Sequence, residues 1–196
     1  MAYIRANERG KKKGTACSKR GEVTEKLWRD IHLNKNRTEF LGIAPIKEDG
    51  TVKFGAIDID HYQDRNLHQD LIEKISKFKL PLVVCTTKSG GAHCYCFVKS
   101  PVPAETMRSK LYEFASIMGY SKNQAGTETE IFPKETTILT DRGDIPSWIN
   151  MPYPNGENTI RYCIDNNMKH LTLEEFLEYA SKNSIDAEQF EKFKIT

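Results

Sequence analysis

The order of apolar patterns from residue 52 onward constrains the fold of this 196-residue chain more than any other feature. Four short segments have the apolar and β-branched composition of strands: residues 52–59, 82–87, 93–98 and 130–132. Two longer segments repeat apolar residues at the spacing of one helix face: residues 67–78 and 107–118. In chain order these elements read strand, helix, strand, strand, helix, strand. This order predicts an α+β fold of the ferredoxin-like type, in which an antiparallel sheet carries both helices on one face.

The N-terminal flank predicts an addition to this sheet. Apolar residues recur every fourth position between Val23 and Ile31, which is typical of an amphipathic helix. A strand pattern at residues 41–46 is followed by a turn signal at residues 48–51. We therefore predict a β-hairpin over residues 41–60.

The C-terminal flank predicts a last helix, because Thr172 and Glu175 have the spacing of a capping box. Further short strands are predicted at residues 148–151 and 160–164. The expected parts of the chain are a basic flexible arm at residues 1–21, a main domain at residues 22–170 with a small α/β lobe at 22–50 and the sheet at 51–170, and a helical extension at residues 171–196.

The net charge of +2 and the pI of about 8.2 do not by themselves indicate a nucleic-acid-binding protein. The distribution of charge is more informative. Basic residues gather near the N-terminus among glycines: Lys11, Lys12, Lys13, Lys19 and Arg20. Such an arm can contact the phosphates of a template strand without reading its bases, although a merely solvated tail explains the same residues.

Several classes of protein are disfavoured by the composition. No apolar run approaches the roughly 18–20 residues that span a bilayer, so no membrane role is expected. The first ten residues lack the apolar core of a secretory signal, which favours a cytoplasmic location. The five cysteines form no CxxC pairs at zinc-site spacing, so we expect free thiols and no structural zinc.

The strand of residues 52–59 leads directly into two carboxylates, Asp58 and Asp60. Because side chains alternate along a strand, residues at i and i+2 project from the same face. Such a pair can share hard cations such as Mg²⁺ or Mn²⁺, although a solvent-facing acidic pair has the same spacing. Glu130 would add a third carboxylate from a neighbouring strand, and three carboxylates suit two metal ions. Glu128, two residues earlier on the same face, is the rival ligand.

The loop between the second and third predicted strands contains Lys88, Ser89, Gly90, Gly91 and His93. Its glycines let backbone N–H groups approach an anion closely, while the lysine and serine supply a charge and a donor. These features predict a site for a triphosphate. The histidine can donate to a phosphate oxygen, although a lone histidine at a strand start is more often structural.

In order and spacing, these motifs resemble the archaeo-eukaryotic primase superfamily. In that family a hydrophobic strand ends in two aspartates separated by one residue, as at Asp58 and Asp60. The second motif is a serine and a histidine separated by small residues, as at Ser89 and His93. The third is a hydrophobic strand with a single acid, as at Glu130.

The resemblance covers residues 22–165. The runs at residues 130–134 and 149–153 look like those of primase-polymerases from mobile elements, phages and CRISPR systems. The resemblance implies an RRM-like catalytic sheet with a small N-terminal lobe, in a prokaryotic, phage or plasmid-encoded protein. This sequence lacks the cysteine and histidine set of the zinc modules that are inserted in several family members. Initiation by such a module is therefore in doubt.

The activity implied is that of a DNA-directed primase-polymerase, which extends or initiates a strand on a single-stranded DNA template and releases pyrophosphate. The implied ligands of two Mg²⁺ or Mn²⁺ ions are Asp58, Asp60 and Glu130. The residues implied to bind the nucleoside triphosphate are Lys88, Ser89, Gly90, Gly91, His93, Lys134 and Asn150. A primer strand is an expected ligand, and a helicase, another replication protein or a further C-terminal region is a candidate partner.

Two other functions remain open at this point. A catalytically idle RRM-like module would bind single strands through exposed aromatic residues, but the corresponding signature is absent. A metal-dependent Rep-type nickase shares the sheet topology but needs two histidines around a hydrophobic residue and a nucleophilic tyrosine. The segment from His93 to Tyr95 offers only one histidine.

Overall fold

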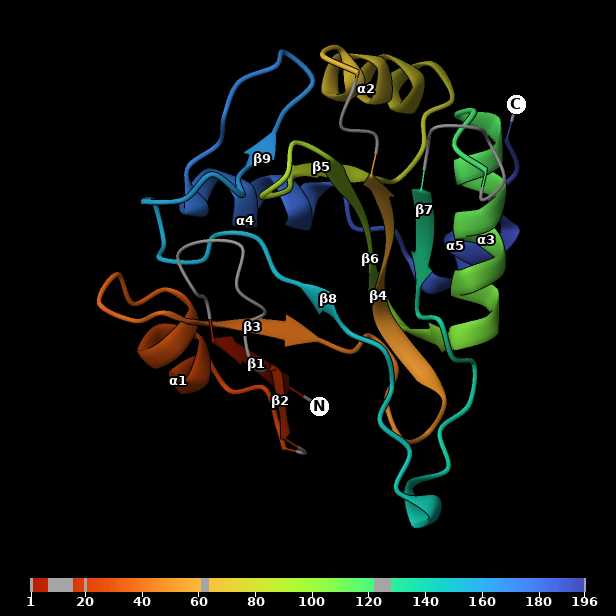
Figure 1. Cartoon of the computed structure of the whole chain (residues 1–196). Coiled ribbons are helices and arrows are strands. Elements are labelled where there is room, and N and C mark those ends of the chain that lie inside the picture. Colours follow the sequence, from red (N-terminus) through yellow and green to blue (C-terminus); the bar gives the residue numbers. More distant parts are fainter. Residues whose placement is uncertain (1, 7–15, 20, 61–63, 122–127, 196) are drawn as a thin grey trace.

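The computed structural model describes residues 2–6, 16–19, 21–60, 64–121 and 128–195. Its main element is a five-stranded antiparallel sheet with the strand order β7-β4-β6-β5-β9 (Figure 1). The strands are β4 (Thr51–Asp60), β5 (Val83–Thr86), β6 (Ala92–Pro103), β7 (Glu128–Phe132) and β9 (Cys163–Ile164). The two helices between them are α2 (Leu67–Lys77) and α3 (Ala104–Ile117). The predicted order of elements and the α+β class are confirmed.

One face of this sheet is covered by α2, α3 and α5 (Ala187–Lys192). Alternate strand residues such as Ile57, Ile59 and Cys94 are fully buried against these helices. Each apolar side chain of that size stabilises the fold by about 1.5–3 kcal/mol on burial. The helix α3 lies directly on β4, because a Cβ atom on Gly55 would come within 2.7 Å of the Leu111 side chain.

The opposite face of the sheet is only partly covered. Tyr95 and Phe132 pack there in a second core together with Tyr153 and with Phe176 of α4 (Leu173–Lys182). The strand residues that point to this face beyond that core are polar, and they include the acidic residues predicted from the sequence. Cys85, Cys94, Cys96 and Cys163 are free and buried.

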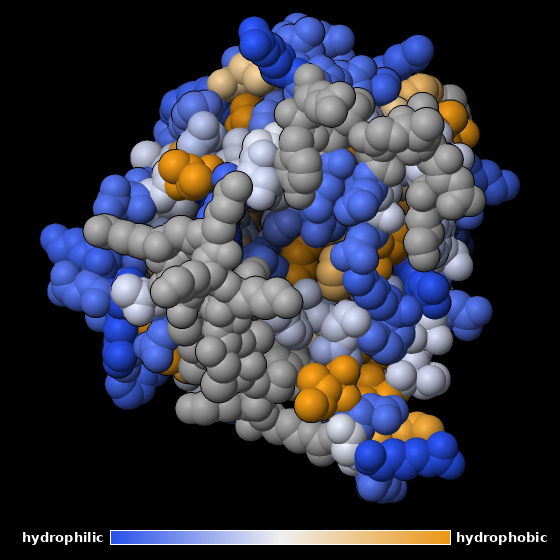
Figure 2. Space-filling model, in the orientation of Figure 1, coloured by the Kyte–Doolittle hydropathy of each residue, from blue (hydrophilic) through white to orange (hydrophobic). Residues whose placement is uncertain are grey.

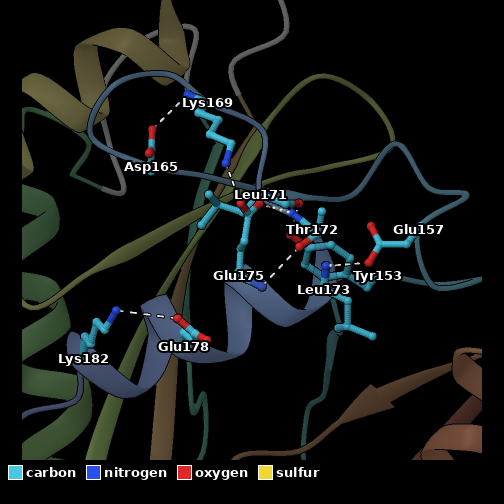
Figure 3. A network of polar contacts seen from close by, with 10 residues as sticks. All are labelled: Tyr153, Glu157, Asp165, Lys169, Leu171, Thr172, Leu173, Glu175, Glu178 and Lys182. Carbon is cyan, nitrogen blue, oxygen red and sulfur yellow. Dashed lines mark hydrogen bonds and ion pairs between the residues drawn. The ribbon is translucent and has the colours of Figure 1, made fainter.

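Polar contacts at the start of α4 attach this second core to the C-terminal part of the chain (Figure 3). The predicted capping box is present, with the Thr172 hydroxyl accepting from the Glu175 N–H and the Glu175 carboxylate accepting from the Thr172 N–H. Lys169 donates to the same carboxylate over 2.5 Å. The Tyr153 hydroxyl donates to the Leu171 carbonyl over 2.7 Å, which holds the segment around Tyr153 in place.

A second, four-stranded sheet has the order β2-β1-β3-β8. Its strands are β1 (Ala2–Ala6), β2 (Ala16–Lys19), β3 (Glu39–Ile43) and β8 (Ile149–Asn150). The predicted N-terminal helix is present as α1 (Glu25–Leu27), continued by the π-helical turn η1 (Trp28–His32). A short 3₁₀ turn, η2 (Thr140–Arg142), lies in the connection to β8.

One sequence prediction for this region is wrong. The hairpin over residues 41–60 does not form, since β3 pairs with β1 and β8 and meets the other arm only through the Ile46–Val52 bridge. The turn between them was correctly placed, with the Gly50 N–H donating to the Lys47 carbonyl. Within the segment predicted as an arm, residues 2–6 and 16–19 form the strands β1 and β2.

His32 links the second sheet to the rest of the molecule. Its Nδ1 accepts from the Leu41 N–H over 3.0 Å, and its Nε2 donates to the Pro152 carbonyl over 2.7 Å. The pKa of this imidazole is lowered from 6.5 to about 4, chiefly by burial; the hydrogen bond to Pro152 opposes this shift and the positive charge of Arg161 adds to it. The ring is therefore a neutral bridge between η1, β3 and the segment before Tyr153.

The coloured part of the surface seen in Figure 2 is mostly hydrophilic. On the face seen in Figure 1, hydrophobic residues form small separate patches between hydrophilic ones (Figure 2). Among the helices of the described residues, none has both the length and the apolar character needed to cross a membrane.

Candidate active site

The predicted acidic residues lie on the less covered face of the five-stranded sheet. In the β4–β7 register Asp58 is opposite Glu130, and in the β4–β6 register it is opposite His93. Directly opposed residues of antiparallel strands have Cβ atoms about 4.5–5.5 Å apart. Glu130, Asp58 and His93 therefore form one row across three strands. Asp60 follows two residues later on the same face.

A chain of hydrogen bonds fixes the orientation of His93. The Tyr95 hydroxyl donates to the Asn150 carbonyl oxygen over 2.7 Å and lies 3.1 Å from His93 Nδ1. Burial raises the pKa of Tyr95, so its hydroxyl keeps its proton. The hydroxyl donates this proton in the hydrogen bond to the Asn150 carbonyl oxygen. Nδ1 of His93 must therefore carry the hydrogen that the Tyr95 oxygen accepts. In the neutral ring this leaves Nε2 with a lone pair.

That lone pair faces an unsatisfied carboxylate oxygen. His93 Nε2 lies 3.3 Å from Asp58 Oδ1, which is buried and has no hydrogen-bond partner within the described part of the chain. Two acceptors that face one another at this distance repel, and an unpaired buried acceptor costs about 1–3 kcal/mol. A proton or a cation bound at Asp58 would relieve both costs. The oxygen chemistry of this row therefore fits a hard divalent ion.

The third carboxylate has a cationic partner in the structure. Lys134 Nζ lies 2.6 Å from Glu130 Oε1, and the register places the rival, Glu128, opposite Asp60. Both glutamates are thus on the face of the two aspartates. Among the described residues, no group of three or more histidine, cysteine or acidic side chains is already gathered closely enough to hold a metal ion. The carboxylates of the row could act as metal ligands only after their side chains move closer together.

The predicted phosphate loop packs against the end of β4. A Cβ atom on Gly91 would lie 2.5 Å from the Ile59 carbonyl and 3.1 Å from Asp60 Oδ1, so only glycine allows this approach. Gly90 has a positive φ of 90°, and Ser89 beside it is exposed. His68 supports the loop from α2, because its Nε2 lies 3.0 Å from the Gly91 carbonyl. The loop is thereby held next to the aspartates.

A pocket of about 260 Å³ lies beside this loop. It is lined by Phe40, Lys88, Pro154, Asn155, Asn158, Thr159, Ile160 and Arg161. The side-chain oxygen of Asn155 is buried without a hydrogen-bond partner. The pocket therefore combines cationic side chains with a free acceptor, close to the loop that carries Ser89.

Sequence reasoning missed several contributors to the site. Asn155 and Arg161 come from a segment without a recognisable motif, and only the fold brings them to Lys88. Tyr95 reads as an ordinary strand aromatic in the sequence. Thr87 also has a buried hydroxyl without a partner, and it borders Gly91 at the base of the loop. An unpaired polar atom leaves no trace in the amino-acid pattern.

Other predicted residues are not brought to the loop. Lys134 lies at the β7 side of the sheet, two strands away from β6, where the loop ends. Asn150 reaches the site through its backbone carbonyl, which holds Tyr95. The basic residues predicted to contact the template at positions 11–13 and 20 lie outside the described residues, and Lys19 is placed only as the last residue of β2.

Comparison with known proteins bears directly on this geometry. No curated protein matches the chain. A family model described as the archaeo-eukaryotic primase domain of the TOTE conflict system matches residues 3–191, which include both sheets, the acidic row and the phosphate loop. The resemblance predicted from the sequence is thereby confirmed, and the chain belongs to the archaeo-eukaryotic primase domain family of TOTE conflict systems.

Proposed function

We propose that this domain is a metal-dependent nucleotidyltransferase that extends a primer strand on a single-stranded DNA template. Membership of a primase family provides the reaction class. The observation that carries the proposal is the row of Glu130, Asp58 and His93 across three strands, in which Asp58 Oδ1 is buried without a donor. A catalytically idle binding module would have no use for a carboxylate left in this costly state.

Asp58, Asp60 and Glu130 are the proposed ligands of two Mg²⁺ or Mn²⁺ ions. When bound, such ions would favour ionisation of the attacking 3′-hydroxyl and neutralise the charge on the leaving pyrophosphate. The carboxylates of this face repel one another in the absence of a cation. This repulsion favours the binding of a cation between them. Lys134 holds Glu130 in the meantime.

The incoming nucleoside triphosphate is proposed to bind at the other end of the row. Backbone N–H groups of the loop at residues 88–91 and the side chains of Lys88 and Ser89 face its phosphates. His93 can donate to a phosphate oxygen only when Nε2 carries a proton in addition to the one on Nδ1, because Nδ1 already gives its hydrogen to Tyr95. The pocket beside Lys88 is suited to the rest of the nucleotide.

The strand order of the main sheet supports a further detail of the proposal. In the spatial order β7-β4-β6-β5, the two central strands are β4 and β6, which are the first and third of these four strands along the chain. We infer an RRM-like catalytic sheet, with the second sheet as the small lobe that faces the template. The single-stranded template and its primer are thus the proposed macromolecular ligands, and a helicase or another replication protein is a proposed partner.

The experiment that tests this function is incorporation of a labelled nucleotide on a primed DNA template, with Mg²⁺ or Mn²⁺ and with EDTA. The wild-type chain is expected to extend the primer only with metal, and Asp60→Asn and Glu130→Gln are expected to lose at least about a hundredfold in rate. Asp141→Asn, in the exposed η2 turn, is the matched control. Extension in EDTA, or full activity of Asp60→Asn, would contradict the metal-dependent mechanism.

The same assay decides between the two glutamates. Glu128→Gln is expected to stay active if Glu130 is the third ligand. An inactive Glu128→Gln beside an active Glu130→Gln would move that role to Glu128, which the register places opposite Asp60.

A further inference from the structure

The outer edge of the main sheet carries a second polar pocket. The strand β7 is an edge strand, and a pocket of about 120 Å³ lies between it and α3. The lining residues are Arg108, Tyr112, Thr129, Glu130, Ile131 and Lys134. Glu130 thus belongs both to this pocket and to the acidic row. Thr129 is opposite Ile59 in the register, so the pocket opens on the α3 side of the sheet edge, and Glu130 is the residue that it shares with the acidic row.

Two donors in this pocket have no hydrogen-bond partner among the residues that the structure describes. The Thr129 hydroxyl and Arg108 Nε are buried atoms without any hydrogen bond, and Thr129 as a whole is only 5% exposed. Buried polar atoms are almost always hydrogen-bonded, because an unpaired one is costly. Both groups can donate, so they fit a ligand that presents acceptor oxygens.

The charges around the pocket favour an anion. Arg108 lies over the Tyr112 ring at 5.7 Å, which orients the guanidinium, and Lys134 is the second cation. Glu130 is the only acidic side chain among the described lining residues, and it is already paired with Lys134. The volume of about 120 Å³ is well below the roughly 300 Å³ at which small-molecule pockets begin. A single phosphate group fits these charges and this size.

The strand order indicates which phosphate this is. Along the sheet, the triphosphate loop joins β5 and β6 on one side of β4, whereas this pocket lies at β7 on the other side, at the edge next to α3. In phosphoryl transfer, the attacking and leaving oxygens are roughly in line on opposite sides of the phosphorus. Resting on the function proposed above, we propose that the pocket binds a backbone phosphodiester of the primer strand near its 3′ end and so positions the attacking hydroxyl.

The proposal is tested by measuring the binding of a fluorescent primed DNA template by anisotropy, without nucleotide and without turnover. Thr129→Val keeps the side-chain shape and removes only the unpaired hydroxyl, so it is expected to fold normally. We expect Arg108→Gln to raise the Kd for the primed template about tenfold and to lower its salt slope by about one, and Thr129→Val to raise the Kd about threefold. Lys192→Gln, which removes an exposed lysine of α5, is the charge-matched control and should bind as the wild type does.

Two further measurements identify the bound phosphate. The Kd for the same template without a primer, and the KM for the nucleotide, should each change less than about twofold. A rise in nucleotide KM with unchanged primer affinity would assign the pocket to the triphosphate and overturn the proposal. Equal losses with and without primer would also overturn it, by making the pocket a general strand contact. Wild-type binding by both variants removes the pocket from the mechanism, whereas a wild-type chain that binds primer but incorporates nothing refutes the proposed function alone.

Discussion

Replacement of Asp58 by asparagine should stabilise the metal-free protein while abolishing nucleotide incorporation. The carboxylate of Asp58 is opposite Glu130 in the register, and its Oδ1 is buried without a donor, 3.3 Å from the Nε2 lone pair of His93. An asparagine amide in this position can donate to Nε2. The substitution therefore removes a repulsion and creates a hydrogen bond at once.

The size of the effect follows from these contacts. A like-charged pair directly across two antiparallel strands costs roughly 0.2–1 kcal/mol. The lower end applies here, because the Glu130 side chain is 52% exposed and is screened by solvent and by Lys134. Relief of the unpaired Asp58 oxygen adds about 1 kcal/mol. A net gain of about 1 kcal/mol in the free energy of unfolding corresponds to a rise in Tm of about 2–4 °C for a chain of this length.

The assay is thermal and urea unfolding of wild type and Asp58→Asn, first in EDTA and then with Mn²⁺. Saturating metal should raise the Tm of the wild type, because an ion that binds only the folded state stabilises it, and should raise that of the variant much less. Asp141→Asn, on the exposed η2 turn, should shift neither value. A variant that is less stable than wild type in EDTA by more than about 1 kcal/mol would refute the reasoning, since Asp58 would then be a paired partner of His93 and not an unsatisfied ligand.

Two further predictions concern the imidazoles. The pKa of His32 is lowered to about 4, chiefly by burial, so below pH 6.5 the unfolded chain binds a proton that the folded chain does not. The free energy of unfolding should therefore be highest above pH 6.5 and should fall by up to about 3 kcal/mol towards pH 4. Urea titrations across this range should show a weaker pH dependence in His32→Gln; an identical slope would mean that other groups dominate. Tyr95→Phe leaves the Asn150 carbonyl and His93 Nδ1 without their partner, so unfolding should become easier by about 1–3 kcal/mol and the KM for nucleotide should rise severalfold, as measured by urea unfolding and steady-state incorporation. An unchanged KM would show that the orientation of His93 does not matter for the nucleotide.

The main sheet could be predicted from the sequence because its signals are local. Apolar alternation in β4 and the helical period of α2 and α3 each depend on residues close together in the chain. The end of α3 at Gly119, whose φ is 82°, could be predicted for the same reason. The same alternation correctly placed Asp58 and Asp60 on one face, since β-strand geometry leaves no other outcome.

Pairing between distant segments could not be predicted in the same way. The strand predicted at residues 41–46 was expected to pair with its neighbour in sequence, whereas the observed strand β3 pairs with β1 and β8. Its residues Leu41 and Ile43 are apolar enough to join either sheet, and the choice depends on long-range packing around His32. The helix α5 was missed because its six residues are too few to establish a period.

The sequence allowed the residue types of the candidate site to be predicted. It did not allow the contacts that these residues make to be predicted. The carboxylates and the loop of residues 88–93 carry motifs, so the sequence singled them out. The ion pair between Lys134 and Glu130 could not be predicted, and it is seen only in the structure, where Lys134 lies just after β7. Asn155, Tyr95 and Thr129 became visible through burial and unpaired atoms, which are properties of three-dimensional packing.

The register across β6, β4 and β7 has a consequence for how this domain can vary. Insertion of one residue inside β4 would turn Asp58 toward the face covered by α3, among Met107 and Leu111, and would turn Ile57 outward. Deletions within the strand would have the same effect, whereas changes of length in the connections on either side would leave the parity of the strand intact. Homologues should therefore differ freely in loop length while the spacing from the start of β4 to its second aspartate stays constant, and tags or sensor modules can be inserted only outside the strands.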